Sequence, residues 1–170
     1  DEIKKNNYDN NSFKIFFKQT ILLTIAYVLT KKKQYSEKAK NNIIMWFVDK
    51  NTSMTPHLKY AQSIPFKGKG QGIIECRGLI YLTDCIKLLK DFFSKQELTT
   101  IYNWFDSYLS WLLNSNEGKL EFNRNNNHSI SYITQIIVIS HFLSKINITI
   151  DYIKIIEKKL KDNIDNNGVL

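Results

Sequence analysis

Proline is confined to one short region of this 170-residue chain, and this constrains the fold more than any other feature. The two prolines are Pro56 and Pro65. Because proline breaks the interior of a helix, the long stretches on either side of this region are free to be helical. Four glycines also fall within residues 49–78. We therefore expect a long ordered loop there, and loops of this length in compact domains are usually functional.

Apolar residues on both sides of this loop recur at the period of an α-helix. Ser94 and Glu97 form a capping box, with a hydroxyl side chain at the cap and a carboxylate three residues later. It opens an amphipathic helix that runs to Leu112, before a polar loop over residues 114–127 that is broken by Gly118. The remaining helices are predicted over residues 13–30, 34–48, 79–93, 129–143 and 150–164.

These elements predict an all-α chain of antiparallel helical hairpins, in which 129–143 is an inner helix shielded on both sides. No segment alternates as a strand would. Two architectures fit, a helical bundle or a stack of hairpins curved into a toroid or solenoid. The long loop favours the second, because a bundle rarely needs one. The chain is expected to be a single domain over 1–170, or part of a larger one, since domains commonly have ~100–200 residues.

The formal net charge of +8 indicates an anionic partner, which by charge alone is a polyanionic polysaccharide, a nucleic acid or a membrane surface. Lysine, asparagine and isoleucine are all abundant, so part of this charge is compositional drift. The apolar segment 21–29 is about half the ~20 residues that a bilayer requires, and we interpret it as part of a core helix. No signal peptide is visible.

Cysteine and histidine give no sign of a metal or cofactor. Cys76 and Cys85 are nine residues apart without neighbouring ligands, so they are expected to be ordinary buried thiols. His57, His128 and His141 have no ligand spacing. We therefore expect neither a metal site nor a cofactor.

The polar run 125–129, Asn-Asn-Asn-His-Ser, leads directly into the apolar helix predicted over 129–143. An asparagine or serine before a helix commonly caps its free backbone N–H groups, and His128 would then be a satisfied neighbour. Unpaired polar groups at a buried position cost roughly 1–3 kcal/mol each, so such groups have partners or a function. Spacing alone favours the cap, and the surrounding pattern favours a functional site.

Three ordered blocks of this chain resemble the alginate lyase family, the α/α-toroid polysaccharide lyases. The blocks are Leu23 to Phe47, including Ala26-Tyr27 and Tyr35-Ser36-Glu37; Met54 to Glu75, including Tyr60-Ala61-Gln62 and Gly68-Lys69-Gly70; and Trp104 to Gln135, including Trp111-Leu112 and Asn126-Asn127-His128-Ser129. The resemblance covers roughly residues 20–143 and implies an incomplete α/α toroid, with 49–78 as a long cleft loop.

The resemblance implies β-elimination on alginate or a related polyuronate. Asn127 and His128 match the residues that neutralise or polarise the uronate carboxylate, and a histidine can also act as the base. Gln62, Tyr60 and Asn126 are the candidates for substrate binding, although Tyr60 is as well explained by packing of the loop. The implied partner is an anionic polysaccharide, with no nucleic acid and no membrane, and the implied location is the periplasm or the cell exterior.

The chain also departs from the family pattern. It has Lys69 where the family usually has arginine, and Glu75 where it has aspartate, which puts any binding role there in doubt. The family's proton-transferring tyrosine and an arginine come from later helices and have no counterpart here, so we expect a central fragment with half of the catalytic set. The alternative is a catalytically incomplete helical module that binds acidic polysaccharide. A basic scaffold for nucleic acid or protein would explain only the charge.

Overall fold

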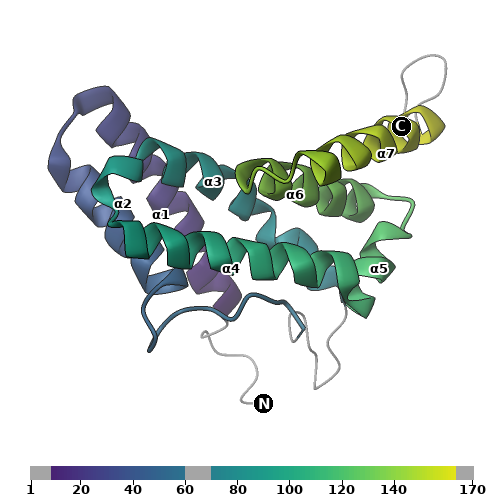
Figure 1. Ribbon diagram of the computed structural model, residues 1–170, viewed down its shortest axis with the longest axis horizontal. Coiled ribbons are helices and arrows are strands. Elements are labelled where there is room, and N and C mark those ends of the chain that lie inside the picture. Colours follow the sequence, from purple (N-terminus) through teal and green to yellow (C-terminus); the bar gives the residue numbers. More distant parts are fainter. Residues whose placement is uncertain (1–8, 60–69, 164–170) are drawn as a thin grey trace. The chain divides into compact units, whose positions relative to one another are not determined.

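The computed structural model describes residues 9–59 and 70–163, and every regular element in these ranges is helical (Figure 1). The elements are α1 (Asp9–Thr30), α2 (Lys33–Phe47), the 3₁₀ helix η2 (Gly70–Gly78), α3 (Leu79–Leu88), the 3₁₀ helix η3 (Lys90–Phe92), α4 (Lys95–Asn114), α5 (Asn116–Phe122), α6 (Asn127–Phe142) and α7 (Ile146–Asn163). The predicted all-α class is therefore confirmed.

The chain divides into two compact units, one made of residues 1–55 and 81–101 and the other of residues 56–80 and 102–170. In the first unit, α1 and α2 form an antiparallel hairpin. Phe16 near the start of α1 contacts Trp46 near the end of α2, with ring centroids 5.0 Å apart. The amide of Asn42 donates to the hydroxyl of Thr20 across the same interface, at 3.3 Å. Clustered aromatic rings thus form the core of this hairpin.

The capping box predicted at Ser94 is present in the first unit. The backbone N–H of Glu97 donates to Oγ of Ser94 at 3.2 Å, and the backbone N–H of Ser94 donates to Oε2 of Glu97 at 2.6 Å. The ammonium of Lys40 forms an ion pair with the same carboxylate at 3.0 Å. The start of α4 is therefore satisfied by the side chains that the sequence places there.

In the second unit, α6 and α7 form a hairpin, and the two helices lie side by side in Figure 1. The turn between them passes through Ser144, which has a φ of 59°. The hydroxyls of Ser140 and Thr149 share a hydrogen bond at 2.8 Å across the hairpin. On α6 itself, Ile133, Ile136 and Ile139 are all fully buried, as predicted for an inner helix.

Two predicted loops contain helices. Residues 114–127 were expected to be a loop broken by Gly118, but Gly118 lies inside α5. Ser115 caps this helix by accepting from the backbone N–H of Gly118 at 3.0 Å. The prediction was wrong because a helix of seven residues is too short to show a period. Similarly, the last part of the predicted 49–78 loop is the 3₁₀ helix η2, whose glycines had indicated a turn.

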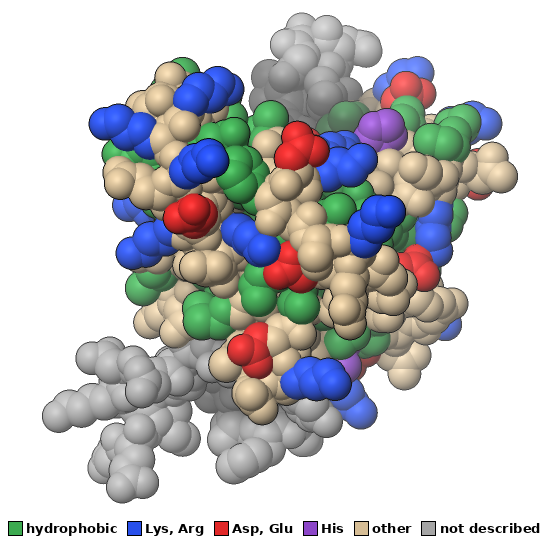
Figure 2. Space-filling model, turned by 60° about the vertical axis from the view of Figure 1, so that its left-hand side comes forward, with side chains coloured by type: hydrophobic (Ala, Val, Ile, Leu, Met, Phe, Trp, Pro, Cys, Tyr) green, Lys and Arg blue, Asp and Glu red, His purple; other side chains and the backbone are tan. Residues whose placement is uncertain are grey.

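Exposed apolar side chains are most numerous on two helices. On α1 these are Ile15, Leu22, Ile25 and Leu29, and on α7 they are Ile146, Ile150, Ile153 and Leu160. Residues 11–30 are also long and apolar enough to cross a membrane by length and composition alone, which is weak evidence because core helices pass the same test. Within 21–29 only Thr24 is buried, while Leu22, Ile25 and Leu29 are exposed, so the core-helix interpretation of this segment is not confirmed. Figure 2 shows hydrophobic side chains between basic and acidic ones on one face of the molecule.

Candidate active site

The Asn126-Asn127-His128 motif lies at the beginning of α6. Asn126 is the N-cap, with an extended backbone, and its Oδ1 accepts from the backbone N–H of His128 at 3.0 Å. Asn127 is the first residue of the helix and its side chain is exposed. The cap expected from the sequence is therefore formed by Asn126. Its predicted contact with substrate stays a prediction, as do the roles of Asn127 and His128.

A buried carboxylate lies behind the ring of His128. Glu121, on α5, is 0% exposed, and its Oε2 lies 2.9 Å from Nδ1 of His128. Its Oε1 forms an ion pair with Nε of Arg124 at 2.7 Å. His128 is itself 24% exposed, so one side of its ring faces the carboxylate and part of the ring reaches solvent. The hydrogen bond to Glu121 therefore fixes the buried side of the ring.

The turn that carries Arg124 is fixed from two sides. Lys159, on α7, donates from Nζ to the backbone carbonyl of Phe122 at 2.9 Å and to that of Arg124 at 3.2 Å. Its ammonium also lies 5.2 Å from the centroid of the Phe122 ring. From α6, the hydroxyl of Ser129 donates to the same Phe122 carbonyl at 3.2 Å. These contacts connect the end of α5 to α6 and α7 and place two cations close to the motif.

Below the motif, buried polar side chains on α6 bond to neighbouring segments. The hydroxyl of Tyr132 donates to the carbonyl of Leu112 at 2.8 Å. The hydroxyl of Tyr108 donates to Oε1 of Gln135 at 3.1 Å, and Nε2 of Gln135 donates to the carbonyl of Ile73 at 3.0 Å. The end of the 49–78 segment is thus bonded to α6 two turns after the motif.

These tyrosines are structural donors. Burial raises the pKa of Tyr108 well above its ordinary value, and it also raises that of Tyr132, which is close to the phenol of Tyr152. A phenol with a raised pKa does not become a phenolate near neutral pH. Both side chains are also buried and their hydroxyls donate to protein acceptors, so we assign them a structural role.

Several residues singled out from the sequence lie away from the motif or fall outside the residues that the structure describes. Tyr60, Gln62 and Lys69 fall within 60–69, which is not among the described residues. Glu75 lies in η2. His57 lies beside Trp111, with ring centroids 6.4 Å apart. In the described ranges 9–59 and 70–163, no group of three or more His, Cys, Asp or Glu side chains is arranged to hold a metal ion.

The three supporting residues Glu121, Arg124 and Lys159 were not found from the sequence. Glu121 and Arg124 belong to a segment interpreted as a loop, and Lys159 lies in the helix predicted over 150–164, where its pattern does not distinguish it from the neighbouring lysines. The only sign of this contact in the sequence is a carboxylate, Glu121, seven residues before His128. It indicates a contact only once the position of α5 is known.

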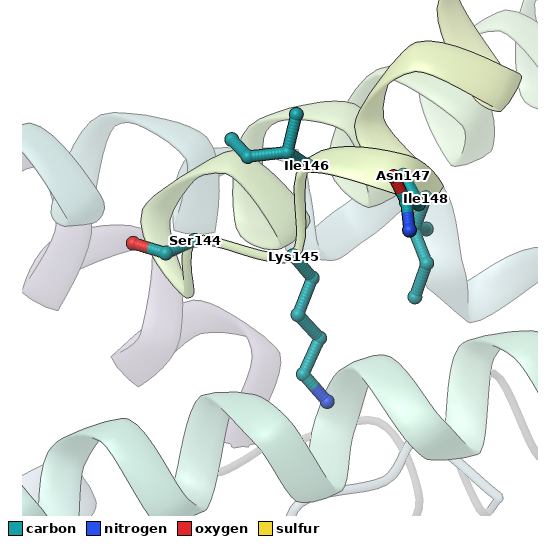
Figure 3. A pocket seen from close by; sticks show the side chains of 5 residues that line it. All are labelled: Ser144, Lys145, Ile146, Asn147 and Ile148. Carbon is teal, nitrogen blue, oxygen red and sulfur yellow. The ribbon is translucent and has the colours of Figure 1, made fainter.

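A hollow of about 400 Å³ lies at the α6–α7 turn, away from the motif. It is lined by Ser144, Lys145, Ile146, Asn147 and Ile148 (Figure 3). The side chain of Lys145 extends from the turn toward the helix below it, in agreement with its ion pair to Asp106 on α4. The hollow is open and its one cation is already paired, so we assign it no ligand.

The described elements form an all-helical scaffold, and comparison with known proteins shows which family it belongs to. The family model for alginate lyase matches residues 2–170, and the chain belongs to the alginate lyase family. It is similar to the crystal structure of an alginate lyase from Bacteroides ovatus, with 26% sequence identity and a TM-score of 0.88. The match covers 92% of this chain and 43% of that one, so this chain spans less than half of that protein. The comparison with curated proteins gives no match.

Both findings agree with the sequence. The resemblance predicted from residues 20–143 is confirmed and extends over nearly the whole chain. The helical fold and its likeness to a solved alginate lyase are consistent with the predicted partial α/α toroid.

Proposed function

We propose that this chain carries the carboxylate-binding part of a lyase that cleaves alginate or a related polyuronate by β-elimination. In this reaction a base removes the proton on the carbon next to the uronate carboxylate. A carbon–carbon double bond then forms while the glycosidic carbon–oxygen bond breaks, and the leaving oxygen takes up a proton. The first step requires that negative charge accumulating on the carboxylate is stabilised, because the proton is otherwise not acidic.

The observation that carries the proposal is the pairing of an exposed amide with a held imidazole at a helix N-terminus. Asn127 is exposed and His128 is fixed by Glu121. The first turn of α6 adds the positive end of the helix dipole, while its backbone N–H groups at His128 and Ser129 already donate to Asn126. Donors that are already in place where charge develops make the largest contribution to many enzymatic rates.

Asn127 and His128 are assigned different parts of this task. The amide N–H of Asn127 donates to one carboxylate oxygen. The ring of His128 either accepts the proton of the sugar at Nε2, or, when doubly protonated, donates from Nε2 to the other carboxylate oxygen. Asn126 and the residues Tyr60 and Gln62 are proposed to contact the sugar rings. Because the substrate is a large extracellular polymer, we propose a periplasmic or extracellular location.

Substitution of Asn127 and His128 tests this assignment when the binding of charged and neutral oligomers is compared. Asn127→Ala and His128→Gln should weaken binding of mannuronate oligomers, measured by calorimetry, and should leave binding of neutral mannan oligomers unchanged. Glutamine is chosen because its amide can still donate to Glu121. Asn125→Ala is the matched control, since Asn125 is exposed and precedes the motif in the same asparagine run.

Equal losses with charged and neutral oligomers would contradict the proposal, because they would place the two residues away from the carboxylate. Retained binding of mannuronate together with no elimination by the protein that carries this chain would favour the alternative, a helical module that binds acidic polysaccharide without cleaving it.

A further inference from the structure

Glu121 is the one described carboxylate that is completely buried. A carboxylate in a protein interior is costly unless it is paired and hydrogen-bonded. Here Oε2 is hydrogen-bonded to Nδ1 of His128 at 2.9 Å, whereas Oε1 lies 2.7 Å from Nε of Arg124 in an ion pair without hydrogen-bond geometry. An ion pair with Arg124 alone would leave the second oxygen without a donor. His128 therefore supplies the hydrogen bond to Oε2 of the carboxylate, and the carboxylate in turn restrains His128.

The location of α5 makes this contact possible. Gly118 packs so closely on the end of α4 that an added Cβ would lie 1.9 Å from the carbonyl oxygen of Leu112. This approach brings Glu121, one turn later on α5, against the first turn of α6. A buried residue on a short helix is thus directed at an imidazole that is part of the proposed site.

The contact selects one protonation pattern of the ring. An ionised carboxylate accepts hydrogen bonds and donates none, so Nδ1 of His128 must carry the proton that lies between them. No hydrogen bond to Nε2 occurs within the described part of the chain. Nε2 is therefore the ring atom left for a ligand. Buried acceptors of this kind fix both the tautomer and the orientation of functional histidines.

We infer that Glu121, held by Arg124, is a positioning residue that fixes the ring of His128 so that Nε2 is the nitrogen presented to the uronate. This inference takes one thing from the proposed function, namely that the ligand is a uronate. The geometry of Glu121, Arg124 and His128 is independent of it. Glu121 acts through His128 and does not itself touch substrate.

The ring tautomer tests the inference directly. Long-range ¹H–¹⁵N spectra of the protein, with the His128 signals assigned from His128→Gln, should show the proton on Nδ1. In Glu121→Met, which removes the acceptor at similar volume, the protonation of the two nitrogens should shift toward Nε2. Glu121→Gln keeps an acceptor oxygen without the charge and should give an intermediate pattern. A proton on Nε2 in the unaltered protein, or the same pattern in all three proteins, would overturn the inference.

The rate of elimination gives a second readout. At metal sites, loss of the residue that orients a histidine ligand typically costs about 10- to 100-fold, and we expect a similar loss for this histidine. Glu121→Gln should therefore lower kcat by about this factor with little change in KM. Glu97→Gln is the matched control, because it alters another ion-paired carboxylate, far from α6 in sequence, and should leave kcat and the tautomer unchanged.

An equal loss of kcat in both variants would overturn the inference, since it would indicate a general effect on stability. The spectra do not require elimination to occur. An inactive protein would thus contradict the proposed function, while the tautomer alone would decide the role of Glu121.

Discussion

The hydroxyl of Tyr108 donates to the side-chain oxygen of Gln135 at 3.1 Å, and both side chains are fully buried. Gln135 donates in turn to the carbonyl of Ile73, which is 62 residues away in the chain. A single glutamine therefore connects η2, α4 and α6 beneath the proposed site. Nothing in a hydrophobic pattern requires a polar residue at this position, and these two hydrogen bonds give the buried amide its partners.

Gln135→Leu should destabilise the second unit. The substitution leaves the Tyr108 hydroxyl and the Ile73 carbonyl buried without partners, which costs ~1–3 kcal/mol. Urea unfolding would measure the loss. Gln96→Leu is the control, since Gln96 is exposed on α4 and the same change there should be within about 0.5 kcal/mol of neutral. Equal effects of the two substitutions would contradict the role given to Gln135.

Gly118→Ala should also lower stability, although alanine is the better helix former by ~1 kcal/mol. The new Cβ would lie 1.9 Å from the carbonyl oxygen of Leu112, a backbone atom that cannot move aside like a flexible side chain. Overpacking of this kind costs ~1–3 kcal/mol or more, so the clash outweighs the gain in propensity. Asn116→Ala, at an exposed position of the same helix, should be neutral or stabilising in the same unfolding experiment. A stabilised Gly118→Ala protein would show that α5 is not packed as described.

The contribution of Glu97 should depend on pH. Burial acts to raise the pKa of this carboxyl, but hydrogen bonds from Ser94 and the ammonium of Lys40 outweigh it and hold the pKa below its ordinary value of 4.5. A lowered pKa in the folded state means that the stabilisation is complete above the unfolded pKa and is lost as the pH falls through the folded one. The difference in unfolding free energy between the unaltered protein and Glu97→Gln should be constant near neutral pH and shrink in acid. A difference that grows as the pH falls would contradict the capping arrangement.

Both thiols should be unreactive in the folded protein. Burial raises the pKa of Cys76 and that of Cys85, although a hydrogen bond with Thr24 acts in the opposite direction at Cys85. The thiolate is the reactive form, so labelling with a thiol reagent at mild pH should be slow for the folded chain and rapid for both thiols in denaturant. Rapid labelling of either thiol under native conditions would show that its helix opens or is not packed as described.

The sequence predicted the long helices well because each buries a stripe of apolar residues at a fixed period. The start of α4 was predicted to the residue, since Ser94 and Glu97 satisfy its free backbone groups through local contacts. Helix α5 was missed because seven residues do not complete enough turns to show a period. Its formation depends on the contact between Gly118 and the end of α4, which is tertiary.

Only part of the proposed site can be seen in the sequence. The Asn-Asn-His motif is contiguous, so its position before an apolar helix is visible in the sequence. The residues that hold it, Glu121, Arg124 and Lys159, come from three segments and meet only in the folded chain. Lys159 shows the limit clearly, because its pattern in the sequence does not distinguish it from the neighbouring lysines, and in the structure it bonds two carbonyls of the turn before the motif.

The most direct test of the proposed function is the formation of unsaturated uronate, followed by its ultraviolet absorbance, when the protein that carries this chain is incubated with alginate. The absorbance should rise, and Asn127→Ala should reduce the rate by about 10²–10³-fold, the usual effect of losing a donor to developing charge. Asn125→Ala should retain the full rate. No rise with the unaltered protein, or a rise that Asn127→Ala leaves undiminished, would contradict the account.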